Sequence, residues 1–209
     1  MYKIFVNECP LIIATADEYQ QMHTSDFMRV ECNKEEFAQV LEWMFRGPSK
    51  GFITITANPD KAFDILKDVC KPIDAAGGVV FNDSGHLLMI NRMGYWDLPK
   101  GKVDPGETFD FTAIREVKEE CGVKEIKLGE PVARTYHLYN QYPHKMLKTC
   151  HWYLMTCPDG VVPKPQAEEH ITEAIWKDMA GVDLDSLHTY ETIRGLLKTV
   201  FAEKDKIEL

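Results

Sequence analysis

The stretch from Gly101 to Val123, GKVDPGETFDFTAIREVKEECGV, constrains this chain more than any other part of it. Glu116, Glu119 and Glu120 have the spacing that places side chains on one face of a helix. Like charges four residues apart destabilise a helix by roughly 0.2–0.5 kcal/mol. A hard divalent cation such as Mg²⁺ relieves this repulsion, because it prefers oxygen ligands. The spacing therefore predicts either a metal site or, as the plainer alternative, a solvated acidic face.

The residues around the three glutamates favour the metal site. Thr108 is a natural N-cap and Gly122 a natural helix stop. The preceding segment, residues 99–107, is rich in turn formers, so it can present backbone carbonyls to a metal and lysines to phosphate. An apolar stripe places the acidic face at the edge of a docked helix, and it consists of Ile114, Val117 and Cys121.

This stretch resembles the Nudix box, G-x5-E-x7-R-E-U-x-E-E-x-G-U, in which U is a bulky aliphatic residue. Every fixed position is filled: Gly101, Glu107, Arg115, Glu116, Val117, Glu119, Glu120, Gly122 and Val123. The resemblance covers roughly residues 73–203 and implies a Nudix-type α/β/α sandwich with a mixed sheet. It also implies a hydrolase of phosphoanhydrides that needs Mg²⁺, for which Mn²⁺ can substitute.

The resemblance also implies roles for individual residues. The implied metal ligands are Glu116, Glu119, Glu120 and the backbone carbonyl at Gly101. The catalytic base is Glu119 or Glu116, or a glutamate from a later loop, for which the candidates are Glu169, Glu168 and Glu173. Glu107 and Arg115 are implied to be structural, because in the family they pair and hold the loop against the helix.

Substrate-binding candidates are the cations and tyrosines that flank the predicted site. We favour six of them, which are Arg92, Lys100, Lys102, Lys148, Tyr139 and Tyr153. Three further candidates are less favoured, namely Lys145, Tyr136 and Tyr142. Taken alone, a lysine is more often a surface charge, and a tyrosine in a strand is usually part of the core. The segments 96–102, 148–154 and 165–171 resemble those of diadenosine polyphosphate and diphosphoinositol polyphosphate hydrolases.

Three functions therefore stay open. The favoured one is a Mg²⁺-dependent pyrophosphohydrolase that cleaves a phosphoanhydride bond in a nucleoside diphosphate-linked substrate, such as a dinucleoside polyphosphate. The second is a hydrolase of an inositol pyrophosphate, which a strongly basic cleft would favour, or of ADP-ribose. The third is a non-catalytic nucleotide-binding regulator, which the complete set of box glutamates disfavours.

The remaining sequence predicts two domains. Residues 1–72 are predicted to form a small α/β N-terminal domain of unknown role and order βββαβα, with strands at 2–6, 11–14, 27–31 and 52–56 and helices capped by Asn33 and Asn58. Residues 73–209 are predicted to form the Nudix domain, with the junction at Lys71-Pro72. Its predicted elements are a hairpin of strands 77–81 and 87–90, the box helix, strands 132–139, 146–156 and 174–176, and a helix over about 190–201.

Composition bears on partners and compartment. The formal charge of −9 argues against broad binding to nucleic acid or to an anionic membrane. No apolar run approaches the ~20 residues of a membrane span, and the N-terminus lacks the apolar region of a signal peptide. The six cysteines have irregular spacing, which favours reduced thiols. We expect a cytoplasmic protein with a small-molecule substrate, no nucleic-acid or membrane partner, and a homodimer left open.

Overall fold

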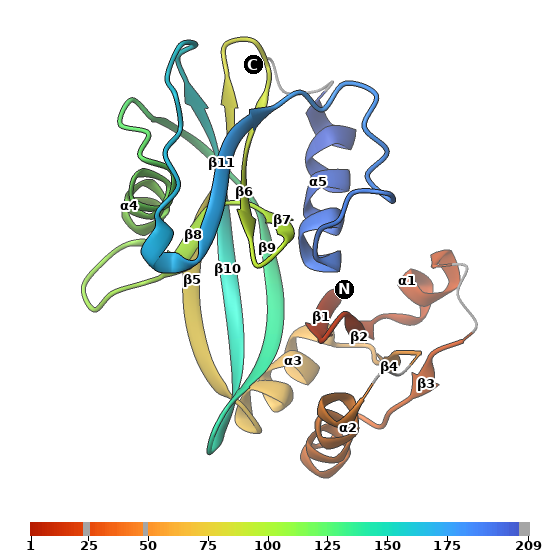
Figure 1. Ribbon diagram of the computed structural model, residues 1–209. Helices are drawn as coiled ribbons and strands as arrows, with labels where there is room; N and C mark the ends of the chain where they lie inside the picture. Colours follow the sequence, from red (N-terminus) through yellow and green to blue (C-terminus); the bar gives the residue numbers. More distant parts are fainter. Residues whose placement is uncertain (23–25, 48–49, 205–209) are drawn as a thin grey trace. The chain divides into compact units, whose positions relative to one another are not determined.

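The computed structural model describes residues 1–22, 26–47 and 50–204, so the last five residues of the predicted Nudix domain lie outside the described part. The chain divides into two compact units (Figure 1). The first comprises Met1–Ile73 and Tyr136–Thr149, and the second Asp74–Thr135 and Cys150–Leu209. The sequence analysis assigned residues 136–149 to the Nudix domain. They group with the first unit because the first strand pairs in parallel with this stretch, Ile4 opposite Tyr136.

The first unit is a small sheet with helices. Its elements are β1 (Tyr2–Val6), β2 (Cys9–Ala14), α1 (Ala16–Gln21), β3 (Met28–Arg29), α2 (Lys34–Arg46), β4 (Phe52–Ile55) and α3 (Pro59–Asp68). The strand order is β1-β2-β4-β3, with β2/β4 and β3/β4 parallel and β1/β2 antiparallel. The caps at Asn33 and Asn58 are confirmed, since their side chains accept hydrogen bonds from the amides of Glu36 and Lys61.

The predicted order of the first unit is correct except for α1, which the sequence analysis missed. Thr15 and Glu18 form a capping box there, in which each side chain accepts a hydrogen bond from the other residue's backbone amide. The pattern T-x-x-E is visible in the sequence. This pattern alone does not predict a helix, because α1 has only six residues and none of them is buried, so its sequence has no apolar period.

The second unit contains a longer sheet and two helices. Its elements are β5 (Lys71–Asn82), β6 (Leu87–Arg92), β7 (Tyr95–Asp97), β8 (Lys100–Lys102), α4 (Phe109–Cys121), β9 (Lys127–Gln141), β10 (His144–Cys157), the 3₁₀ turn η1 (Ala167–Glu169), β11 (Ile171–Lys177) and α5 (Glu191–Lys204). The strand order is β11-β6-β5-β10-β9, with β7 paired to β6 and β8 to β5. Three of these strands extend into the first unit, which contains residues 71–73 of β5, 136–141 of β9 and 144–149 of β10.

The two helices of the second unit cover opposite faces of its sheet (Figure 1). Val117 of α4 packs in one buried cluster with Val80 and Leu88, whereas Leu197 of α5 packs in another with Phe81. Neighbouring strand residues thus point to different helices, as the period of a strand requires. This arrangement confirms the predicted α/β/α sandwich. Among the described residues, no helix is long and apolar enough to cross a membrane.

The strands of the second unit are longer than the sequence predicted, whereas β3 of the first unit is shorter than the predicted 27–31. β5 begins at Lys71, so the predicted domain junction at Lys71-Pro72 is the start of a strand. β9 and β10 leave only Tyr142 and Pro143 between them, where a polar loop was expected. The short strand β8 was missed, because its three residues KGK have no apolar pattern and form a strand only by pairing with β5.

A partly buried hydrogen bond in the second unit gives a test of this packing. The fully buried Trp152 donates from its indole Nε1 to Thr135 Oγ1 at 2.8 Å. Thr135→Val keeps the side-chain shape but removes the acceptor, so the free energy of unfolding should fall by about 1–3 kcal/mol. Urea denaturation measures this, with the exposed Thr199→Val as the matched control. Equal stabilities of the Thr135 and Thr199 variants would contradict the assignment.

Candidate functional site

The box helix α4 begins and ends where the sequence predicted. Thr108 has the extended backbone of an N-cap, and Gly122 has the left-handed conformation of a C-cap, with φ of 65°. A left-handed residue is usually glycine because glycine has no Cβ to clash with the backbone. The helix therefore ends at Cys121, one residue after Glu120, and the backbone oxygens of these two residues accept hydrogen bonds from Lys164 and Gln166 in the loop that precedes β11.

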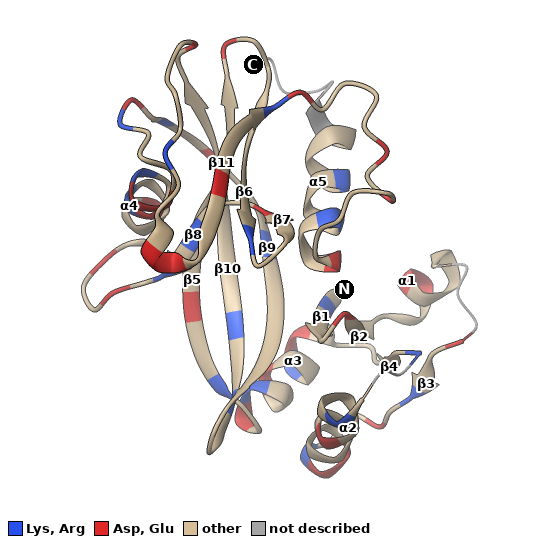
Figure 2. Cartoon of the chain, viewed as in Figure 1, with Lys and Arg blue, Asp and Glu red and all other residues tan. Residues whose placement is uncertain are grey.

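The three glutamates of α4 differ in exposure, so the helix face is not a uniformly solvated one. Glu120 is 2% exposed and the Glu116 side chain 13%, whereas the Glu119 side chain is 50% exposed. Figure 2 shows acidic residues on α4 and just before β11. The solvated-face alternative is therefore wrong for Glu116 and Glu120, because burial of a charged carboxylate requires partners.

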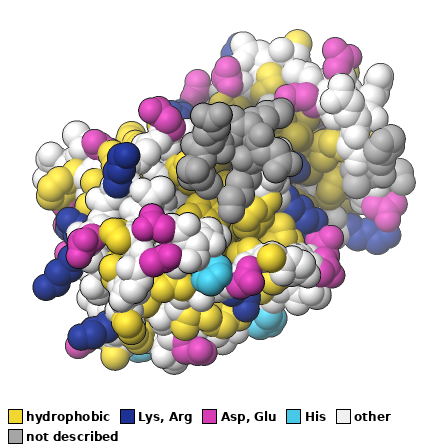
Figure 3. Space-filling model, turned by 90° about the horizontal axis from the view of Figure 1, so that it is seen from above, with side chains coloured by type: hydrophobic (Ala, Val, Ile, Leu, Met, Phe, Trp, Pro, Cys, Tyr) yellow, Lys and Arg dark blue, Asp and Glu magenta, His cyan; other side chains and the backbone are white. Residues whose placement is uncertain are grey.

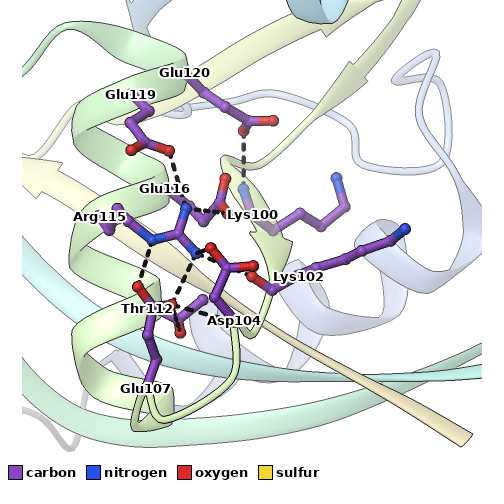
Figure 4. A network of polar contacts seen from close by, with 9 residues as sticks. All are labelled: Lys100, Lys102, Asp104, Glu107, Thr112, Arg115, Glu116, Glu119 and Glu120. Atoms are coloured by element: carbon purple, nitrogen blue, oxygen red, sulfur yellow. Dashed lines mark hydrogen bonds and ion pairs between the residues drawn. The ribbon is translucent and has the colours of Figure 1, made fainter.

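Arg115 supplies most of these partners (Figure 4). Its Nε and Nη2 donate to the two carboxylate oxygens of Glu107, each at 2.9 Å. Its Nη1 donates to Glu116 at 2.7 Å and to Glu119 at 2.9 Å, and Nη2 also donates to the backbone oxygen of Lys102 at 3.0 Å. The pairing of Glu107 with Arg115 is the one that the resemblance implied. One guanidinium thus ties the loop after β8 to two turns of α4.

Burial leaves an excess of negative charge beside Arg115. Desolvation raises the pKa of Glu120 to about 7, although the attraction of Lys100 and the Lys100 amide work against it. Desolvation also raises the pKa of Glu116, and the repulsion from Glu119 and Glu169 adds to this against the pull of Arg115. Such carboxyl groups hold a proton more easily, so the site favours any bound cation that replaces that proton.

The absence of a side chain at Gly101 makes room for one of these carboxylates. A Cβ at this position would lie 2.1 Å from the Glu116 carboxyl carbon and 2.2 Å from both of its oxygens. No real side chain fits so close, so the Glu116 carboxylate occupies the space that glycine leaves. Gly101 lies in β8 opposite Ala76, which fixes its backbone.

The carboxylates do not converge on one point in this conformation. Among the described residues, no group of three His, Cys, Asp or Glu side chains has the geometry of a metal site. Glu116 and Glu119 instead share Nη1 of Arg115, and Glu120 accepts from the Lys100 amide at 2.9 Å. The donor set is nevertheless one that a hard cation prefers, because it consists of carboxylates.

The Lys100 ammonium has partners inside the protein. Its Nζ donates to Asp97 Oδ2 at 2.5 Å and to the Leu98 backbone oxygen at 3.3 Å. The two side chains of this pair are only 15% and 6% exposed. Lys100 was predicted to bind substrate, but its ammonium is used inside the protein. Asp97 was not among the predicted site residues, and the only signal for it was a spacing of three residues from Lys100.

The other predicted residues lie in different places. Arg92 Nη2 contacts Glu169 at 3.2 Å, and the side chain of Lys102 is exposed. Tyr153 packs against the cluster on the α4 side of the sheet, and desolvation raises its pKa. Glu168 and Glu173 are exposed. The favoured candidates Lys148 and Tyr139 belong to the first unit, and there Lys148 Nζ lies 5.8 Å from the centre of the Tyr139 ring.

Thr112 is a further residue that sequence reasoning missed. Its hydroxyl donates to Glu107 Oε2 at 2.7 Å, and the amide of Asp104 donates to the same oxygen at 3.3 Å. With Arg115, these donors lower the pKa of Glu107 to about 2. Thr112 is fully buried in α4. Its position one helical turn from Thr108 suggested only a helix interior, so the sequence carried no distinct signal for this contact.

This pKa gives a pH dependence with a definite sign. The folded pKa of Glu107 is depressed, so its contribution to stability is present above the unfolded value of 4.5 and is lost as pH falls towards about 2. Glu107→Gln should be less stable than the wild type at pH 7, and the difference should shrink below pH ~4.5. Urea denaturation at pH 7, 5 and 3 measures this, with the exposed Glu130→Gln as control. A difference that stays constant down to pH 3 would contradict it.

Comparison with known proteins agrees with this geometry. A NUDIX domain profile matches residues 71–194. An RNA pyrophosphohydrolase of Wolbachia sp. subsp. Brugia malayi is 30% identical over 103 residues, which are 43% of this chain and 61% of the relative. The putative mutator protein MutT4 of Mycobacterium tuberculosis is 32% identical over 145 residues, 64% of this chain and 56% of that protein. The chain thus spans about three fifths of the length of these relatives.

A solved structure supports the fold independently. The binary complex of a C. elegans Ap4A hydrolase has a TM-score of 0.52 and 22% sequence identity, over 65% of this chain and 99% of that one. At this identity the likeness concerns the fold. The profile, in contrast, matches more than half of the residues and includes the whole box. This chain belongs to the NUDIX domain family.

Proposed function

We propose that this chain is a Mg²⁺-dependent pyrophosphohydrolase that cleaves a phosphoanhydride bond in a nucleoside diphosphate-linked substrate, such as a dinucleoside polyphosphate. The observation that carries the proposal is the group of box carboxylates on α4, in which Glu116 and Glu120 are largely buried and have raised pKa values, with Glu116 lying in the space at Gly101. The names of relatives add support, since an RNA pyrophosphohydrolase and a putative 8-oxo-dGTP diphosphatase of Bacillus subtilis both denote hydrolysis at nucleotide phosphates.

Nudix hydrolases generally use divalent metal ions, and the residues here suit one. Glu116, Glu119 and Glu120 would hold it together with the backbone carbonyl of Gly101. Bound there, a divalent ion neutralises phosphate oxygens and supplies an activated water. Mg²⁺ is the ion that such oxygen donors favour in the presence of phosphates, and Mn²⁺ has similar preferences. Because the Glu119 side chain is half exposed, it can change rotamer without disturbing the core.

The chain's own residues have separate tasks in this proposal. Arg115 orients the carboxylates of Glu116 and Glu119, because its Nη1 donates a hydrogen bond to each of them. Glu169 accepts the proton of the attacking water. Arg92 orients the Glu169 carboxylate, since its Nη2 lies 3.2 Å from Glu169 Oε2. The proximity of Glu169 to the carboxylates is supported by the repulsion through which it raises the pKa of Glu116. Glu119 or Glu116 is the alternative base. In this proposal the exposed Lys102 neutralises a phosphate.

The surroundings of Glu169 favour a nucleoside over an inositol pyrophosphate. A hollow of about 660 Å³ is lined by Met93, Pro165, Ala167, His170, Ile171 and Thr172. Its lining includes the neighbours of both Arg92 and Glu169 but no Lys, Arg, Asp or Glu. A ring that carries phosphates all round needs cations on every side, whereas a base and sugar do not. Figure 3 shows basic side chains interspersed with acidic ones on the face that it draws.

The proposal is tested by phosphate release with a substrate panel. The panel comprises a dinucleoside polyphosphate, nucleoside triphosphates, ADP-ribose and an inositol pyrophosphate, each with and without Mg²⁺. Glu119→Gln and Glu120→Gln should each lower kcat about 100-fold or more, because each removes a predicted metal ligand. The exposed Glu125→Gln is the control. Turnover that does not need a divalent cation, or full activity in both variants, would reject the proposal.

A second variant probes the metal site without removing a carboxylate. Gly101→Ala places a Cβ within 2.2 Å of both Glu116 carboxylate oxygens, so this carboxylate must move. We expect Mn²⁺ binding, measured by calorimetry on the substrate-free protein, to weaken about 10-fold or more. Gly195→Ala is the matched control, because nothing lies within 4 Å of a Cβ there. An unchanged Mn²⁺ affinity in Gly101→Ala would show that Glu116 and Gly101 are not part of the metal site.

A further inference from the structure

The ion pair of Asp97 and Lys100 is buried at the point where the chain enters the box. An isolated buried charge is strongly unfavourable, so both members need partners inside the protein. Lys100 has two, since Nζ contacts Asp97 Oδ2 at 2.5 Å and the Leu98 oxygen at 3.3 Å. Asp97 has a second one as well, because its Oδ1 accepts from the Leu98 amide at 2.8 Å. Each side chain is thus bonded both to the other and to the backbone between them.

These contacts make residues 97–100 a closed turn between β7 and β8. Two side chains span the turn and both bond to Leu98, whose own side chain is fully buried. On the outer side, the Gly78 amide donates to the Pro99 oxygen at 3.1 Å. β8 then pairs with β5, Lys100 opposite Gly77. The backbone of Lys100 is therefore held from both sides, by the buried pair and by the sheet.

The same turn sets two contacts of the box carboxylates. The Lys100 amide donates to Glu120 Oε2 at 2.9 Å, so this buried carboxylate has a backbone hydrogen-bond partner. The next residue is Gly101, whose Cα lies against the Glu116 carboxylate. A shift of the turn by a few tenths of an ångström would change both contacts at once, because they are made by consecutive residues.

We propose that Asp97 and Lys100 are positioning residues of the carboxylate site. Their ion pair holds the turn that carries the Lys100 amide to Glu120. The same turn keeps the glycine at 101 against Glu116. Lys100 therefore acts through its backbone and its partner Asp97, and not by binding phosphate. This inference rests on the proposed function, because it concerns how the carboxylates are kept ready for a divalent cation.

Two other roles for the pair predict different results. If Lys100 bound phosphate, Lys100→Met would raise KM for the substrate, and Asp97→Asn would not. If the pair acted only through its charges, removing the cation would tighten metal binding and removing the anion would weaken it, since both charges act on Glu120. If the pair holds the turn, both variants weaken metal binding. The sign of the two changes therefore separates the three roles.

The experiment measures Mn²⁺ binding by calorimetry on the full-length, substrate-free protein. The variants are Asp97→Asn, Lys100→Met and the double variant, with the exposed Lys124→Met as control. The double variant leaves no unpaired buried charge, and neutral replacement of a buried pair is often tolerated, so it should fold even where a single variant does not. Amide hydrogen exchange at residue 100 reports on the turn directly. KM is measured at saturating Mg²⁺.

We expect each variant to bind Mn²⁺ about 10-fold or more weakly, with the double variant no worse than the single ones. Exchange at the residue 100 amide should accelerate in all three, while KM stays close to that of the wild type. Opposite shifts in Mn²⁺ affinity, or a raised KM in Lys100→Met alone, would overturn the inference. A wild type that binds no Mn²⁺ would instead reject the proposed function, and amide exchange would still decide whether the pair holds the turn.

Discussion

The guanidinium of Arg115 is the contact on which the candidate site depends. It donates to Glu107, Glu116 and Glu119 and to the backbone oxygen of Lys102. Only arginine offers five donors in a fixed plane that reach several carboxylates at once. Without this group the loop after β8 would keep the Thr112–Glu107 hydrogen bond to α4 but lose the contacts of Arg115 with Glu107 and Lys102, and partly buried carboxylates would lose their compensating charge. The arrangement of loop and helix is therefore an electrostatic one before it is a packing one.

Local sequence was enough for the parts of the site that lie on one element. The spacing of Glu116, Glu119 and Glu120, the caps at Thr108 and Gly122, and the pairing of Glu107 with Arg115 were all expected, and the last of these came from the family resemblance. Helix period and capping depend on neighbours within four residues, so they can be read along the chain. The α/β/α sandwich was predictable from the order of strands and helices along the chain and from the family resemblance.

Contacts between distant segments were not predictable in this way. Lys100 was expected to reach a phosphate, because a lysine beside a site is exposed in most proteins. Its burial follows from Asp97 and from the pairing of β8 with β5, and neither leaves a periodic signal. Similarly, residues 136–149 group with the first unit through the parallel pairing of β1 with β9. The paired residues are more than 130 positions apart in the sequence. Such a pairing depends on tertiary structure and cannot be predicted from a local sequence pattern.

The charges of the site divide into two kinds. Arg115 makes a two-point contact with Glu107, and Lys100 pairs with Asp97, so each of these acids is matched by a cation inside the protein. Among the described residues, the hydrogen-bond donors to the three box carboxylates that remain are Nη1 of Arg115 and the Lys100 amide. Because burial raises the pKa values of Glu116 and Glu120, this remainder is short of positive charge. The structural acids are thus neutralised by structural cations, and the unmatched charge is left where a divalent ion and a phosphate chain would meet.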